Sequence, residues 1–177
     1  MGNKQKTEFL PICIAVMTVS DTRSLADDRS GDALVERLET AGHVLADRAI
    51  IKDEVDLIVD KLREWIDNRE IDAVITTGGT GVTGRDVTPE ALARVQEKDI
   101  PGFGELFRWI SYQKIKTSTI QSRACAGVAN STYIFVLPGS TGACKDGWDE
   151  ILKDQLDIRH KPCNLVELMP RLNEHKV

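Results

Sequence analysis

Apolar residues recur along this chain with two alternating periods. Continuous apolar runs rich in β-branched residues are typical of strands buried on both faces, and they occupy the segments 12–19, 43–51, 71–77 and 132–140. Between and after these runs, apolar residues follow helical spacing, as at Leu34, Val35 and Leu38. This spacing predicts helices from Ser30 to Gly42, after Asp53, from Thr88, and over 102–115, 118–129 and 146–156.

The alternation of strands and helices indicates an α/β fold. Such a pattern favours a three-layer sandwich, in which a mainly parallel central sheet has helices on both faces. A chain of 177 residues is long enough to bury a substantial core. We therefore expect one domain over residues 1–177, with extended termini at 1–10 and 160–177.

Composition and charge exclude several classes of protein. The net charge of -5 argues against binding to nucleic acid or to an anionic membrane. No apolar run reaches the ~18–20 residues that span a bilayer, and the segment MGNKQKTEFLP lacks the apolar core of a secretion signal. A cytoplasmic location is expected. The four cysteines form no Cys-x-x-Cys pair and no cluster with histidines, which argues against a zinc site and against disulfides.

Polar or glycine-rich segments follow four of the predicted strands. In open α/β sheets, ligands bind beyond the carboxyl ends of the strands. The four segments are VSDTRS (19–24), IIKDE (50–54), TTGGTG (76–81) and LPGST (137–141). Together they predict one binding site at the carboxyl edge of the sheet.

The glycine-rich segment contains a match to G-x-G-x-x-G at residues 79–84. The next helix, however, is expected to begin only at Thr88 as N-cap with Pro89 as its first residue, too late for a dinucleotide-binding turn. The acidic residue at suitable spacing, Asp99, is expected to end a helix rather than a strand, and no Gly-Lys-Ser/Thr follows as in a nucleotide P-loop. A nicotinamide-dependent enzyme is therefore excluded. The remaining interpretation of the glycine-rich segment is a loop whose backbone N–H groups approach a phosphate closely.

Several motifs in order resemble one known family. TTGGTG with RDVTPEA, then IPGFGE, QSR and LPG, resemble the molybdopterin-binding family of molybdenum cofactor biosynthesis, and TSTIQSRACAGVANSTYIFVLPGSTGAC with RHKPCN is more similar to its protein B branch than to MogA. The resemblance implies a three-layer α/β domain that assembles as a homotrimer or homohexamer. It also implies an adenylyltransferase that joins the terminal phosphate of molybdopterin to AMP from ATP with Mg²⁺, releasing pyrophosphate. A molybdate-inserting protein would take the product.

The resemblance also implies roles for individual residues. Asp53 and Asp86 match the family's carboxylates, as catalytic residues and as ligands of Mg²⁺, which prefers oxygen atoms. Glu105 and Arg123 are weaker candidates. The residues expected to bind the substrates are Ser20, Asp21, Thr76, Thr77, Gly78, Gly79, Thr80, Gly81, Pro138, Gly139 and Ser140.

Simpler roles for the two aspartates stay open at this point. Asp53 precedes a helix and could serve only as its N-cap. Asp86 could form a surface ion pair with Arg85, which would contribute little stability. The alternative to an adenylyltransferase is a non-catalytic oligomer that binds molybdopterin for storage or transfer. Catalytic members of the family often have Pro before Asp53 and Asn or Gln with Pro after LPG, whereas this chain has Lys52, Ser140 and Thr141.

The segment 101–112, PGFGELFRWISY, is rich in apolar and aromatic residues. Phe103, Phe107 and Trp109 cannot all lie on one narrow stripe of a helix. Part of this segment is therefore expected to pack on a second subunit.

Overall fold

A six-stranded sheet forms the middle layer of the protein, in the strand order β2-β1-β3-β6-β5-β4. The computed structural model describes residues 7–176. Four neighbouring strands are parallel: β1 (Cys13–Val19), β2 (Val44–Ile51), β3 (Ala73–Thr77) and β6 (Thr132–Leu137). At the far edge, β5 (Cys125–Ala129) is antiparallel to β6, and the short β4 (Lys98–Asp99) is antiparallel to β5. The predicted mainly parallel α/β sheet is confirmed.

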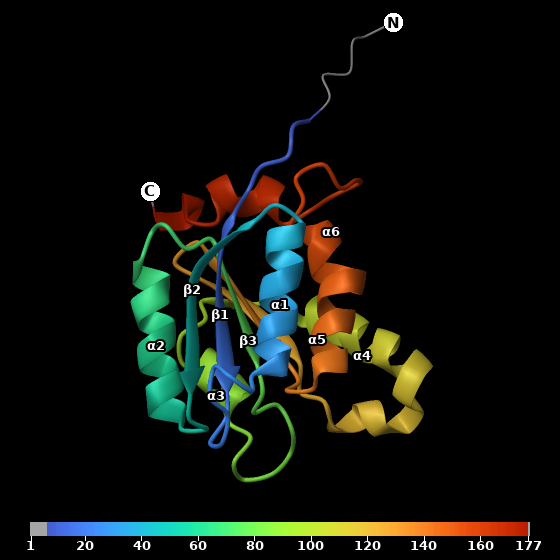
Figure 1. Cartoon of the computed structure of the whole chain (residues 1–177). Helices are drawn as coiled ribbons and strands as arrows, with labels where there is room; N and C mark the ends of the chain where they lie inside the picture. Colours follow the sequence, from blue (N-terminus) through green and yellow to red (C-terminus); the bar gives the residue numbers. More distant parts are fainter. Residues whose placement is uncertain (1–6, 177) are drawn as a thin grey trace, which may run out of the picture.

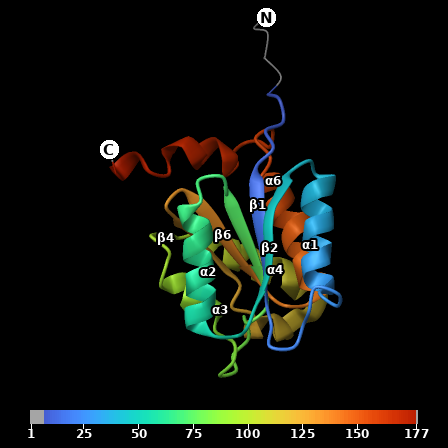
Figure 2. The same ribbon diagram turned by 60° about the vertical axis from the view of Figure 1, so that its left-hand side comes forward.

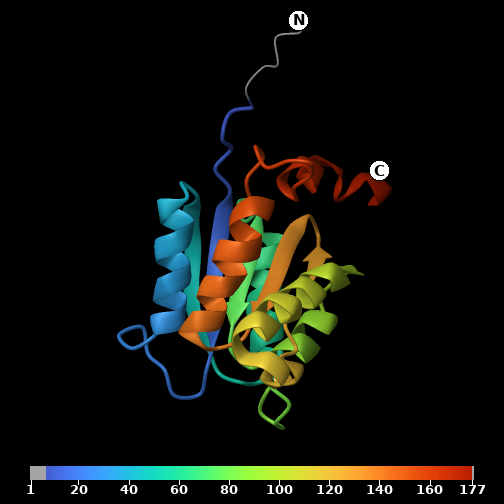
Figure 3. The same cartoon turned by 90° about the vertical axis from the view of Figure 1, so that its right-hand side faces the viewer.

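Helices cover both faces of this sheet (Figures 1 and 2). One face packs against α2 (Val55–Asp67) and α3 (Thr88–Ala93). The other packs against α1 (Arg29–Thr40), α4 (Pro101–Ile115) and a carboxyl-terminal run that Figure 3 shows in front of the sheet. This run consists of α5 (Thr141–Gly147), the π-helical η2 (Trp148–Leu152) and α6 (Lys153–Gln155).

Two hydrophobic cores result, one on each side of the sheet. Alternate residues of a strand point to opposite faces. In β1, Ile14 and Val16 therefore belong to the core under α1 and α4, whereas Ala15 and Met17 belong to the core under α2 and α3. Burial on both faces is the physical reason that the parallel strands are continuous apolar runs.

The segment 118–129 is not a helix, contrary to the prediction. It consists of the 3-10 helix η1 (Lys116–Gln121) followed by strand β5. Asn130 and Ser131 have positive φ values of 45° and 72°, so they form the two-residue turn that lets β5 fold back onto β6 as a hairpin. Asp99 likewise lies in β4 instead of ending a helix.

The helix predicted over 146–156 begins earlier, at Thr141, because the Ser140 side chain caps it by accepting a hydrogen bond from the backbone N–H of Ala143 at 3.1 Å.

The carboxyl-terminal segment is more ordered than expected. It forms the 3-10 helices η3 (Val166–Arg171) and η4 (Glu174–Lys176), which lie across the amino-terminal end of the sheet (Figure 1). The Tyr133 hydroxyl donates to the carbonyl of Leu165 at 2.9 Å, and Val166 is buried. Residues 1–6 of the expected extended amino terminus, and Val177, lie outside the described residues, and 7–12 have no regular secondary structure.

Cys13, Cys125, Cys144 and Cys163 are all free thiols. Within residues 7–176, no helix combines the length and the apolar character needed to cross a membrane.

Candidate functional site

The glycine-rich loop that follows β3 is held in a conformation that only glycine adopts without strain. Gly78 and Gly79 have φ values of 105° and 63°. The N–H of Gly78 donates to Leu137 at 3.0 Å, and the Thr88 hydroxyl donates to the carbonyl of Gly78 at 2.8 Å. Among the described residues, the N–H groups of Gly79 and Thr80 have no hydrogen-bond acceptor. Such free N–H groups in successive residues can bind an anion.

Thr88 does not have the predicted capping role. The N-cap of α3 is Val87, Thr88 is the first helical residue and Pro89 the second. The Thr88 side chain instead faces back to the loop, where it fixes the carbonyl of Gly78. The residue therefore links the glycine loop to the helix that follows it.

A cavity of about 700 Å³ opens at the carboxyl edge of the sheet, beside this loop. It lies where the segments that follow β1, β2, β3 and β6 meet, as predicted from the α/β pattern. Its lining includes these residues proposed from the sequence: Ser20, Asp53, Gly78, Gly79, Thr80, Gly81, Asp86, Pro138, Gly139 and Ser140. Val19, Thr22 and Arg23 also line the cavity, and they belong to the predicted segment 19–24 although they were not proposed individually. The pattern of strands did not identify the remaining lining residues: Phe107, Ser111, Ile115, Ser118, Gln121, Ser122 and Ala143.

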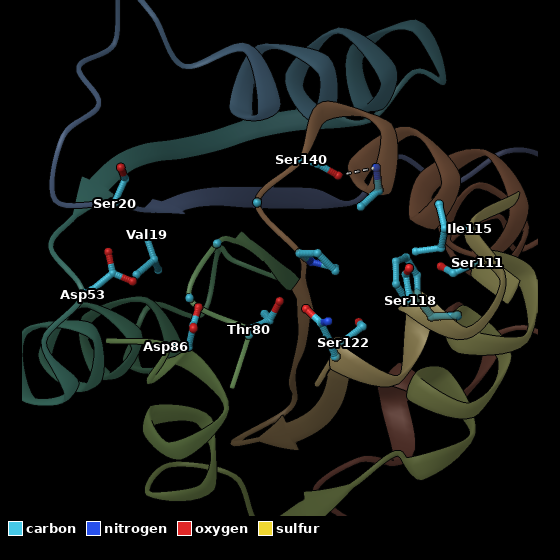
Figure 4. Close-up of a pocket in the computed structure, with 18 of the residues that line it drawn as sticks. Val19, Ser20, Asp53, Thr80, Asp86, Ser111, Ile115, Ser118, Ser122 and Ser140 are labelled. Atoms are coloured by element: carbon cyan, nitrogen blue, oxygen red, sulfur yellow. Dashed lines mark hydrogen bonds between the residues drawn. The ribbon is translucent and has the colours of Figure 1, made fainter. Parts of the chain in front are cut away.

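The two ends of the cavity differ chemically (Figure 4). Asp53 and Asp86 lie at one end, whereas Ser111, Ile115 and Ser118 from α4 and η1 lie at the other. Ser111 and Ile115 lie in the segment 102–115, where a helix was correctly predicted, and Ser118 lies in the segment 118–129, where it was not. The QSR motif was the sequence signal for this wall, since Gln121 and Ser122 both line the cavity.

Three residues proposed to bind substrate do not line the cavity. Thr76 and Thr77 have no exposed surface. The hydroxyl of Thr77 donates to the carbonyl of Pro138 at 3.0 Å, so it joins β3 to the turn after β6 beneath the site. Asp21 lies outside the cavity and is paired with Arg85, with contacts as short as 2.6 Å.

Of the weaker candidates, Glu105 lines a separate hollow beside β5. Arg123 supports the glycine loop from outside the cavity. Its Nε donates to the carbonyl of Gly81 at 2.7 Å and its Nη2 to that of Asp86 at 2.6 Å, while a further N–H contacts the Glu90 carboxylate. Arg123 therefore stabilises the loop by donating hydrogen bonds to two of its backbone carbonyls.

Asp53 and Asp86 both face the glycine loop. A Cβ atom built on Gly79 would lie 3.0 Å from Asp53 Oδ1, and one built on Gly81 would lie 2.6 Å from Asp86 Oδ2. Burial and the negative charge of Asp21 raise the pKa of Asp53. The hydrogen bond from the Thr83 hydroxyl, at 2.6 Å, lowers the pKa of Asp86. The two carboxylates therefore border one loop in different electrostatic environments.

The simpler roles for these aspartates are not the ones that the structure shows. The N-cap of α2 is Glu54, without a side-chain cap, so Asp53 does not cap the helix. Arg85 forms its ion pair with Asp21 and not with Asp86. This pair links the exit of β1 to the glycine loop, and the hydrogen bond from Arg85 lowers the pKa of Asp21.

The carboxylates suit a hydrated Mg²⁺ better than a fully protein-ligated metal. Among residues 7–176, no group of three or more His, Cys, Asp or Glu side chains is arranged to hold a metal ion. Mg²⁺ usually keeps several waters and binds one or two carboxylates together with substrate phosphates. The pair Asp53 and Asp86, beside free backbone N–H groups, fits that requirement.

Comparison with known proteins gives a consistent assignment. The family described as "Probable molybdopterin binding domain" matches residues 15–158. "Molybdenum cofactor biosynthesis protein B" of Escherichia coli (strain K12) is 48% identical over 158 residues, covering 89% of this chain and 93% of the relative. The protein of the same name from Staphylococcus aureus (strain MRSA252) is 42% identical over 161 residues, covering 89% and 95%.

A solved structure of a molybdenum cofactor biosynthesis protein B superposes with a TM-score of 0.84 at 35% identity, over 93% of this chain and 98% of the other. Sequence and fold agree over nearly the whole length of these proteins. The chain therefore belongs to the molybdopterin-binding domain family, within the group that includes molybdenum cofactor biosynthesis protein B.

Proposed function

We propose that the protein acts in molybdenum cofactor biosynthesis as a molybdopterin adenylyltransferase. Membership in the family supports the biosynthetic role. The observation that supports the specific activity is that Asp53 and Asp86 both border a glycine loop with free N–H groups, in one cavity. This arrangement offers separate places for a metal-bound polyphosphate and for a second phosphate.

In the proposed reaction, an oxygen of the molybdopterin phosphate attacks the α-phosphorus of ATP. The bond from the α-phosphorus to the oxygen that bridges to the β-phosphorus breaks, and pyrophosphate leaves with that electron pair. The nucleophile is already an anion, so no side chain needs to remove a proton from it. Catalysis then consists of aligning two anions and neutralising their charge.

Different residues of the site would bind the metal ion, the phosphates and the heterocycle. Asp53 and Asp86 would hold Mg²⁺, which when bound neutralises charge on the ATP phosphates. The N–H groups of Gly79 and Thr80 would donate to phosphate oxygens. Ser111, Ser118 and Ser122 offer hydroxyl groups to the polar edges of a heterocycle, and Phe107 and Ile115 offer apolar contact.

A non-catalytic molybdopterin-binding protein is the second candidate. The observation in its favour is that this chain has Lys52, Ser140 and Thr141 at positions where catalytic members of the family often have Pro and Asn or Gln with Pro. The two candidates differ in what the aspartates do, because storage or transfer of the pterin requires no Mg-ATP.

The test is an assay of purified protein with molybdopterin, ATP and Mg²⁺, following pyrophosphate and the adenylylated product. We expect turnover by the wild type, and a loss of at least about 100-fold in Asp53→Asn, since an amide replaces a charged metal ligand. Asp60→Asn, on the exposed side of α2, is the matched control and should keep full activity. Molybdopterin binding without turnover in the wild type would support the non-catalytic candidate.

We also propose self-association through the outer side of α4 and η1. Phe103 and Phe107 are buried in the core of the subunit, whereas Trp109 is 64% exposed. Leu106, Tyr112, Ile115 and Ile120 are exposed on the same segment. A second copy that covers these side chains, in a trimer or hexamer, would remove them from water. Because Ile115 also lines the cavity, such contact would lie next to the site.

A further inference from the structure

Arg23 is the one Lys or Arg among the described residues that line the cavity. It belongs to the loop after β1, and its side chain is 34% exposed. One Nη atom donates to the Ser30 hydroxyl, and the other donates to the carbonyl of Gly139 at 3.3 Å. The guanidinium has five N–H groups in a planar fork. Hydrogen bonds to described residues therefore fix its position while leaving donors for a ligand.

The buried carboxylate of Asp28 lies near the Arg23 guanidinium but makes closer contacts with other groups. The Asp28 carboxylate has no exposed surface, and it lies 3.7 Å from Arg23 but 2.8 Å from Arg48. It also accepts hydrogen bonds from the Thr18 hydroxyl at 2.7 Å and the Gly31 N–H at 3.0 Å. Arg48 pairs with Asp32 as well, also at 2.8 Å. Among the described residues, the 3.7 Å contact with Asp28 is the one ion pair of Arg23, so the Arg23 guanidinium has no carboxylate at hydrogen-bond distance.

The anchor of Arg23 adjoins the glycine loop. A Cβ atom built on Gly139, whose carbonyl accepts from Arg23, would lie 3.2 Å from the Cα of Gly78. The turn after β6 thus packs directly on the first glycine of the loop. Arg23 and the loop therefore border the same part of the cavity.

The two phosphorylated ligands of the proposed reaction place different demands on such a site. The phosphates of Mg-ATP carry their own cation, so they can lie near Asp53 and Asp86. A phosphate monoester without a metal would be repelled by these carboxylates and needs a positive side chain. A guanidinium binds two phosphate oxygens at once, in a geometry that ammonium groups do not reproduce.

We propose that Arg23 binds the phosphate monoester of the pterin substrate through paired N–H···O bonds. This assignment rests on the proposed function, because it takes molybdopterin as the ligand. In this arrangement the phosphates of Mg-ATP lie at Asp53 and Asp86. The metal-free phosphate of the pterin lies at the Arg23 guanidinium.

The test compares two ligands in the absence of Mg²⁺. Dissociation constants of molybdopterin, and of molybdopterin dephosphorylated by a phosphatase, are measured under anaerobic conditions with EDTA for the wild type and for Arg23→Gln. We expect the substitution to weaken binding of the phosphorylated ligand by about 10- to 100-fold, as for loss of charge-assisted hydrogen bonds. Binding of the dephosphorylated ligand should change by less than about threefold.

Two further variants complete the design. Arg171→Gln removes an exposed arginine that is paired with Glu174, and it should leave both constants unchanged. Arg23→Lys keeps the charge but lacks the fork, so it should give a smaller loss, again confined to the phosphorylated ligand. If Arg23→Gln does not fold, the lysine variant provides the comparison.

The outcomes separate the two levels of the proposal. Equal losses for both ligands in the Arg23 variants, or no loss for either, would overturn the assignment of Arg23 while leaving the proposed function intact. Failure of the wild type to bind either ligand would overturn the proposed function, and the assignment with it.

Discussion

Gly78 lies against the end of β1 so closely that a Cβ atom on it would be 2.2 Å from the carbonyl oxygen of Val19. Its φ of 105° is also unfavourable for a residue with a side chain. Gly78→Ala should therefore lower the free energy of unfolding by about 2–4 kcal/mol, through backbone strain and displacement of the loop. Urea denaturation measures this change.

Gly84, later in the same loop, is the matched control. A Cβ atom there would meet nothing within 4 Å. Gly84→Ala should change the stability by less than about 0.5 kcal/mol. Equal effects of the two substitutions would show that the close approach of Gly78 to Val19 is not what requires glycine.

Asp86→Asn should reduce adenylylation without weakening molybdopterin binding. Asparagine keeps an oxygen that can accept from the Thr83 N–H, which donates to Asp86 at 2.9 Å, but it removes the charge proposed to hold Mg²⁺. Adenylylation should fall by orders of magnitude, at about tenfold for each 1.4 kcal/mol of lost transition-state stabilisation. Molybdopterin binding should be unchanged or slightly tighter, because a negative charge near an anion is gone.

Steady-state kinetics with ATP and direct pterin binding check this pair of outcomes, with exposed Asp67→Asn as control. Wild-type adenylylation by a normally folded Asp86→Asn protein would refute the catalytic role. Loss of pterin binding together with activity would instead place Asp86 in the pterin site or in the fold of the loop.

Trp109→Asp should weaken self-association. The indole is 64% exposed on α4, so the free subunit tolerates the substitution, whereas a covered interface would contain an unpaired charge. Sedimentation velocity at micromolar concentration should show an oligomer for the wild type and a shift toward monomer for the variant. Leu57→Asp, on α2, replaces a side chain that is 44% exposed and should leave the oligomer intact. A wild type that sediments only as a monomer would contradict the proposed assembly.

His43 should make the protein less stable below about pH 6.5. Burial lowers the pKa of His43 from its ordinary value of 6.5, and its Nδ1 accepts a hydrogen bond from the Ile12 N–H at 3.3 Å, which requires the unprotonated nitrogen. As the pH falls below 6.5, the unfolded chain binds a proton that the folded protein excludes, so the free energy of unfolding decreases toward the folded-state pKa.

Urea denaturation at a series of pH values from about 7.5 to about 5, on both sides of the ordinary histidine pKa, measures this slope. His43→Asn keeps an acceptor near the position of Nδ1 and does not titrate, so its stability should depend less on pH over the same range. Identical slopes for the two proteins would assign the pH dependence to other groups.

The sequence alone determined the class of fold and the edge at which the site lies. Both follow from local periodicity: runs such as 12–19 and 71–77 can be buried on both faces only in a parallel sheet covered by helices. Parallel strands bring their exits to one edge, so the glycine loop, Asp53, Asp86 and the 138–140 turn were placed together correctly. Motif order was also sufficient for the family.

The tertiary structure decided features that depend on contacts between distant residues. Segment 118–129 has apolar spacing compatible with a helix, but pairing with β6 across Asn130 and Ser131 makes its second half a strand. Periodicity gave no sign that Thr76 and Thr77 would lie beneath the cavity or that Asp21 would pair with Arg85. The cavity role of Arg23 depends on Gly139, 116 residues away, because only folding brings the exits of β1 and β6 within hydrogen-bond distance.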